Sequence, residues 1–155
     1  MKKVLLVAIG SMFIYSCNNK KEDIAVDPNS EVEVKMMDEH LDQDANSAIM
    51  MNNGQRWLVN AEMKPFVMKG EQLVNDYTQN KGTDYKMLAE ELKSQNNQLI
   101  KSCTMDGKSH DELHKWLHPH LKLTEKLEKA TDAAMADATV LELQNSYKQY
   151  HQYFN

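Results

Sequence analysis

The part of the chain best equipped for chemistry is the segment 103–120, which gathers sulfur and imidazole side chains. It holds a cysteine, a methionine and four of the six histidines of the chain, namely Cys103, Met105, His110, His114, His118 and His120. Thiolate, thioether and imidazole groups are the ligands that proteins use for Cu(I), zinc and haem iron. The composition of this segment therefore predicts a site for a soft transition metal or a metal-containing cofactor.

The spacing inside this segment narrows the prediction. His110 and His114 are four residues apart, which puts two imidazoles on one face of a helix, where both can bind one ion. Cys103 and Met105 precede them, and thiolate with thioether favours Cu(I) over hard cations. We therefore expect a metal site made of Cys103, Met105, His110 and His114, with copper as the metal.

The same residues also have a purely structural interpretation, which the sequence leaves open. A buried free cysteine behaves as a small hydrophobic residue, and a methionine fills gaps in a core. His110 and His114 would then serve as helix-start and surface hydrogen-bonding groups. His118 and His120 are expected on the flanks of their helix, in contact with solvent.

The N-terminus resembles a bacterial lipoprotein signal. Lys2 and Lys3 precede an apolar run over residues 4–14, and Ser16 stands directly before Cys17. The run is shorter than the roughly 20 residues needed to span a bilayer. We expect residues 1–16 to be a signal peptide and Cys17 to carry the lipid that anchors the protein to a membrane.

The residues after Cys17 predict a linker and a location. Residues 17–50 are mostly polar and acidic, and Lys21-Glu22-Asp23 resembles the tag of many Bacteroidetes lipoproteins of the outer membrane. Removal of residues 1–16 takes away two lysines and no acid, so the formal charge changes from -5 to -7. An acidic chain of this kind is not expected to bind nucleic acid. We expect a lipid-anchored outer-membrane protein, on the periplasmic side or at the cell surface.

The rest of the chain, residues 51–155, has the helical apolar period throughout and predicts one all-α domain. Four amphipathic helices are expected, over 57–79, 84–104, 110–129 and 133–154. Short turns between helices of similar length favour an antiparallel up-down-up-down four-helix bundle. This topology would bring Met63, Cys103, Met105, His110, His114 and His151 to one end of the bundle.

The domain also resembles the small soluble four-helix b-type cytochromes of the bacterial periplasm. Asn60-Ala61-Glu62-Met63 and Tyr150-His151-Gln152-Tyr153 stand where that family has its haem ligands, a methionine near the start of helix 1 and a histidine near the end of helix 4. The resemblance implies haem b with Met63 and His151 as axial ligands. Gly70, on the inward stripe, would leave room for the porphyrin.

Catalytic functions are not expected. Ser109, His110 and Asp111 are consecutive, and neighbours on a helix point apart, so they cannot form a catalytic triad. We expect a lipid-anchored bundle that binds copper for sequestration or handover, with a metal transporter as a possible partner. The alternatives are a haem electron carrier with a redox partner, and an interaction lipoprotein without a cofactor.

Overall fold

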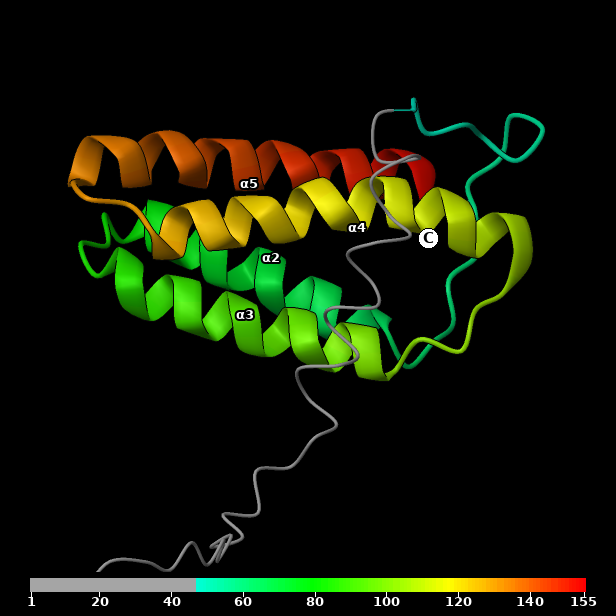
Figure 1. Ribbon diagram of the computed structural model, residues 1–155, viewed down its shortest axis with the longest axis horizontal. Coiled ribbons are helices and arrows are strands. Elements are labelled where there is room, and N and C mark those ends of the chain that lie inside the picture. Colours follow the sequence, from blue (N-terminus) through cyan, green and yellow to red (C-terminus); the bar gives the residue numbers. More distant parts are fainter. Residues whose placement is uncertain (1–46) are drawn as a thin grey trace, which may run out of the picture.

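The protein is all-helical over residues 47–155, which are the residues that the computed structural model describes (Figure 1). Four helices and no strand are present in this part of the chain: α2 (Lys64–Gln79), α3 (Tyr85–Lys101), α4 (Gly107–Glu128) and α5 (Ala133–Tyr153). The predicted signal peptide, Cys17 and the linker up to residue 46 lie outside the described residues.

The helices form a four-helix bundle, as predicted. Each helix packs against the next one along the chain, and α2 also packs against α5, which closes the bundle. Every helix buries one apolar stripe, because hydrophobic residues recur three and four positions apart. The core contains Val67, Val74, Leu88, Leu92, Leu99, Leu113, Trp116, Leu117, Leu127, Ala136, Val140, Leu143, Tyr147 and Tyr150.

Local signals in the sequence set most of the helix ends. Asp84 and Asp132 cap α3 and α5, each with a side-chain oxygen that accepts a hydrogen bond from the backbone N–H three residues on. Lys81 takes a positive φ of 51° after α2, and the Gly82 N–H donates to the Tyr77 carbonyl at 2.7 Å. These bonds satisfy backbone groups that the helix ends would otherwise leave unpaired.

The first helix begins later than predicted. Residues 57–63 were expected to be helical, yet α2 begins only at Lys64. Residues 47–63, which we call the strap, run across one end of the bundle without forming a helix. The Trp57 N–H donates to the Tyr153 carbonyl at 2.8 Å, and the Asn155 N–H donates to the Trp57 carbonyl at 3.1 Å. Pairing with the end of α5 therefore replaces the extra turns of helix.

The strap is also attached to α4 by a buried carboxylate. The Met50 N–H donates to Glu112 Oε2 at 2.7 Å, and Lys115 Nζ donates to Glu112 Oε1 at 2.9 Å. The Trp57 indole N–H donates to the Met50 carbonyl at 2.6 Å. Ser109 and Glu112 have the three-residue spacing of a capping box, but they do not form one. Helix α4 begins two residues before Ser109, so Glu112 is too far along the helix to cap it.

A close contact between α2 and α5 occupies the space beside Gly70. The Tyr147 side chain lies directly over Gly70, so that a Cβ atom at this position would overlap Tyr147 Oη. Both residues are buried. A glycine is therefore required here by the approach of an aromatic ring, because any larger side chain would occupy the same volume.

Candidate metal site

One end of the bundle carries the predicted site, and hydrogen bonds tie its elements together. The Asn60 side chain, in the strap, donates to the Ser102 carbonyl at 2.9 Å and accepts from the Thr104 N–H at 3.2 Å. These bonds connect the residues before α2 to the end of α3. The strap also bonds to the start of α4 and the end of α5, so all four helices contribute to this end.

Three histidines form a column along α4. The ring centroids of His110 and His114 are 4.2 Å apart, with an interplanar angle of 60°, and those of His114 and His118 are 5.7 Å apart. All three side chains are partly buried. A helix brings positions i and i+4 side by side, and the column follows directly from that spacing. We call His110, His114 and His118 the histidine column.

The middle imidazole of the column is held in its neutral form. Burial, together with the positive charges that His110 and His118 can carry, lowers the pKa of His114 to about 4, while Asp111 acts in the opposite direction. Neutral imidazole is the form that binds metals, because its second nitrogen keeps a free lone pair. His114 is therefore ready to act as a ligand at neutral pH without losing a proton.

The predicted sulfur ligands lie in the connection between α3 and α4. Cys103 is a free cysteine, and both Cys103 and Met105 are partly buried and pack against the core. Within residues 47–155, no three His, Cys, Asp or Glu side chains stand together as a metal-ligand group. The pair His110 and His114 is thus the part of the predicted site that the fold brings into contact.

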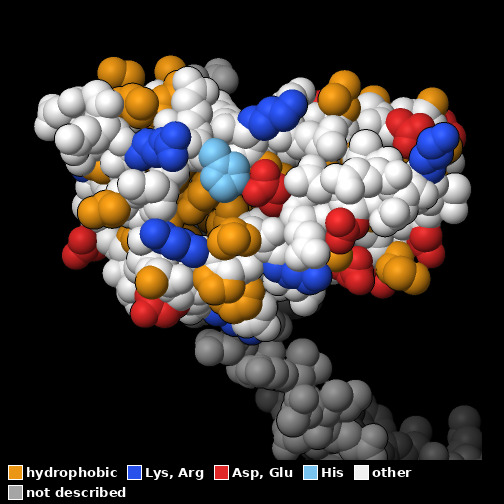
Figure 2. All heavy atoms as spheres, turned by 180° about the vertical axis from the view of Figure 1, so that it is seen from behind, with side chains coloured by type: hydrophobic (Ala, Val, Ile, Leu, Met, Phe, Trp, Pro, Cys, Tyr) orange, Lys and Arg blue, Asp and Glu red, His pale blue; other side chains and the backbone are white. Residues whose placement is uncertain are grey.

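Met63 and His151, the residues matched to haem ligands, lie in different environments. Met63 is 1% exposed and belongs to the core, just before α2. His151 is exposed, and its Nε2 lies 2.7 Å from Glu71 Oε2. On the face seen in Figure 2, a histidine side chain likewise lies beside an acidic one. The volume next to Gly70, expected to admit a porphyrin, is filled by Tyr147.

His120 is buried, whereas the sequence interpretation placed it in solvent. Its ring lies 4.8 Å from the Trp116 ring and 4.7 Å from the Tyr147 ring, measured between centroids. Nδ1 lies 3.0 Å from Ser146 Oγ, and Nε2 is buried with no hydrogen-bond partner among the described residues. Burial lowers the pKa of His120 to about 4. Its place four residues after Trp116 was the overlooked signal, because that position continues the buried stripe.

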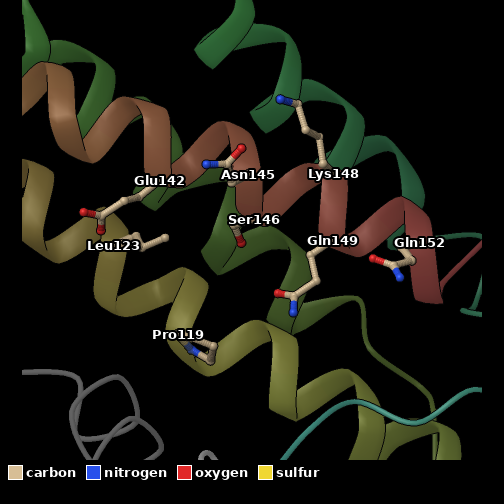
Figure 3. A pocket seen from close by; sticks show the side chains of 8 residues that line it. All are labelled: Pro119, Leu123, Glu142, Asn145, Ser146, Lys148, Gln149 and Gln152. Atoms are coloured by element: carbon tan, nitrogen blue, oxygen red, sulfur yellow. The ribbon is translucent and has the colours of Figure 1, made fainter.

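An open groove runs along the surface between α4 and α5 (Figure 3). Its volume is about 580 Å³, and it is lined by Pro119, Leu123, Glu142, Asn145, Ser146, Lys148, Gln149 and Gln152. Ser146 connects it to His120, which gives a serine beside a histidine. A histidine with a pKa near 4 is a weak base, and no described residue bonds to its other nitrogen. This pair therefore lacks the third group that orients the base of a hydrolase.

Comparisons with protein-family models, with curated proteins and with solved structures found no match to this chain. Within residues 47–155, no helix has both the length and the apolar composition needed to cross a membrane.

Proposed function

We propose that this protein is a lipid-anchored four-helix bundle, with consecutive helices alternating in direction, that binds a soft transition metal for sequestration or handover. Copper is the metal that the side chains favour. The observation that carries the proposal is the contact between His110 and His114, whose ring centroids are 4.2 Å apart on one face of α4. Two imidazoles on adjacent turns can bind one ion with little rearrangement.

The surroundings of the two histidines support copper over a hard cation. Cys103 and Met105 come from the adjoining connection, and sulfur ligands favour Cu(I). These sulfur atoms pack against the core, so a metal bound to the histidines would gain them as ligands through movement of the connection between α3 and α4. Such an opening is compatible with handover, in which a metal has to leave its site as well as enter it.

Copper binding is expected to depend on the helix α4 histidines. In a titration with Cu(I) against a chromophoric competitor, His114→Ala should weaken binding roughly tenfold or more, which corresponds to about 1.4 kcal/mol. Cys103→Ser should also weaken binding, because it removes the only cysteine of residues 47–155, and a thiolate is a strong ligand for Cu(I). His151→Ala is the matched control, since it removes an exposed imidazole from another helix and should leave the affinity unchanged.

Three results would contradict the metal proposal. If His114→Ala and His151→Ala bind Cu(I) as tightly as the unmodified chain, the histidine column is not the site. If hemin binds instead, and binding is lost in Met63→Ala and His151→Ala but kept in Cys103→Ser, the protein is a haem carrier. If neither Cu(I) nor hemin binds, the protein is better interpreted as an interaction module without a cofactor.

We further propose that Cys17 carries the lipid anchor and that the protein resides at the bacterial outer membrane. The support is the basic and apolar N-terminal sequence that ends in Ser16-Cys17. Cys17→Ser is expected to abolish incorporation of labelled fatty acid and to release the protein from the membrane fraction or leave it unprocessed. Normal processing with unchanged membrane partitioning would rule out acylation at this cysteine.

A further inference from the structure

We propose that the strap docks on an anionic lipid surface, with Met50, Met51 and Leu58 as its apolar contacts and Arg56 as its cation. The inference rests on the proposed lipid anchor, because that anchor supplies the bilayer next to the domain. The strap would be a second contact with the membrane besides the lipid anchor. Two contacts would fix the orientation of the bundle on the membrane, which a single lipid anchor would not.

The strap holds its apolar side chains outward on a fixed backbone. Asn52 and Gln55 exchange two backbone hydrogen bonds of 2.9 Å, around a turn in which Asn53 and Gly54 have φ values of 52° and 82°. Positive φ at both central residues defines a tight two-residue turn. Bonds from Met50 to Glu112 and from Trp57 to Met50 then fix this turn to the bundle.

The strap buries some of its apolar side chains and exposes others. Ile49, Trp57 and Val59 belong to the core, while the exposed fractions are 58% for Met50, 40% for Met51 and 73% for Leu58. Six large hydrophobic side chains of residues 47–155 are strongly exposed, and these three fall within nine residues. A single exposed apolar residue is normal, but a group held outward by a rigid turn indicates a contact surface.

The charge of the strap points to an anionic partner. Residues 47–61 of the strap contain the only arginine of the chain and no acid, although the chain has 23 acidic residues and a formal charge of -5. Glu62, the one acid of the strap, follows them near its end and accepts a hydrogen bond from the Asn60 side chain at 3.0 Å. Arg56 is exposed, and Lys108 Nζ lies 5.9 Å from the centre of the Trp57 ring. Figure 2 shows hydrophobic and basic side chains, with some acidic ones, at the end of the bundle that faces left in that view. Guanidinium groups pair well with phosphates, and basic side chains are attracted to anionic lipid.

The position of the strap in the chain favours a bilayer as the occupant. If Cys17 carries the lipid, 29 residues, numbers 18–46, separate it from the first described residue. Twenty-nine residues reach at most about 100 Å, from about 3.3–3.6 Å for each residue, so the anchor would keep the strap near the bilayer. The strap is thus the first part of the described fold after the anchor, and it lies at the outer edge of the bundle end (Figure 1).

Vesicle flotation of the mature chain carrying Cys17→Ser tests this inference without a lipid anchor. The chain should float with vesicles rich in phosphatidylglycerol and much less with phosphatidylcholine vesicles. Leu58→Asp and Met50→Asp should each reduce the bound fraction several-fold. Leu141→Asp and Met87→Asp are the matched controls, because these side chains are 57% and 56% exposed on α5 and α3 and should bind as the parent does.

Further measurements keep the outcomes separate. Circular dichroism and the melting temperature identify any variant that fails to fold, and Arg56→Gln should reduce binding to the anionic vesicles alone. The inference is overturned if the parent chain binds neither vesicle, or if the control substitutions reduce binding as much as Leu58→Asp does. Fatty-acid labelling of the unmodified protein tests the anchor independently, so failure of one proposal is distinguishable from failure of the other.

Discussion

Replacement of Gly70 by alanine is expected to destabilise the bundle by about 1–3 kcal/mol, the usual range for inserting an extra methyl group into a packed core. Alanine is ordinarily the better helix former, by about 1 kcal/mol, so propensity alone predicts the opposite sign. The reason for the loss is that the new Cβ would overlap Tyr147 Oη. Chemical denaturation of both proteins at neutral pH measures the difference.

The effect of Gly70→Ala on stability is expected to change sign once the hydroxyl group of Tyr147 is removed. In a Tyr147→Phe background, the methyl group added by Gly70→Ala no longer overlaps a hydroxyl group. The higher helix propensity of alanine should then dominate the change in stability. The double variant should be at least as stable as Tyr147→Phe alone. If Gly70→Ala is equally destabilising with and without the hydroxyl, the contact between these two residues is not the cause.

Acid is expected to destabilise the fold through His120. The pKa of this buried histidine is about 4, against 6.5 in an unfolded chain. Between these pH values the unfolded state binds more protons than the folded state. The contribution of His120 to the free energy of unfolding is therefore complete above pH 6.5 and decreases as the pH falls towards 4. The loss amounts to about 3 kcal/mol, from about 1.4 kcal/mol for each unit of pKa difference. Denaturation curves at several pH values measure it.

His120→Phe provides the test of this assignment. Phenylalanine keeps an aromatic ring between Trp116 and Tyr147 and cannot take up a proton, so the stability of the variant should depend much less on pH. Some dependence should remain, since the lowered pKa of His114 acts in the same direction. An identical acid loss in the parent and in His120→Phe would exclude His120 as the source.

The existence of four helices was predictable because amphipathic periods act locally. The stripes that run through Leu88 and Leu92, or through Leu113 and Leu117, repeat at helical spacing and have no competing pattern nearby. Asp132 marks the start of α5 by a local signal too, because its carboxylate accepts a hydrogen bond from the backbone N–H only three residues later. Such features require no knowledge of the rest of the fold.

The strap was not predictable by the same route. Residues 57–63 have a helix-compatible pattern, but Trp57 pairs with Tyr153 and Asn155, nearly a hundred residues later. Glu112 likewise follows a serine at capping-box spacing, yet its partner is the Met50 N–H. Local sequence patterns contain no information about a hydrogen bond to a distant segment. Tertiary contacts therefore determine the conformation of residues 57–63 and the partner of Glu112.

The candidate site also has one part that local sequence patterns predict and one part that they do not. The spacing of His110 and His114 predicted two imidazoles side by side, because both stand on one helix. The positions of Cys103 and Met105 relative to those rings depend on the connection between α3 and α4. This connection bonds to Asn60 and meets the first residue of α4, Gly107, at a positive φ of 60°. His120 was misjudged because its residue type suggested solvent while its position in the stripe indicated the core.

The attachment of the strap has a mechanical consequence. A pull applied to the chain ahead of residue 47 would load the Met50–Glu112 bond and the pairing of Trp57 with the end of α5 before it reached α2. The force would be shared by α4 and α5 across several hydrogen bonds and the buried Trp57 ring. The strap would thus act as a strain relief, which spares the first helix from being unwound from its end.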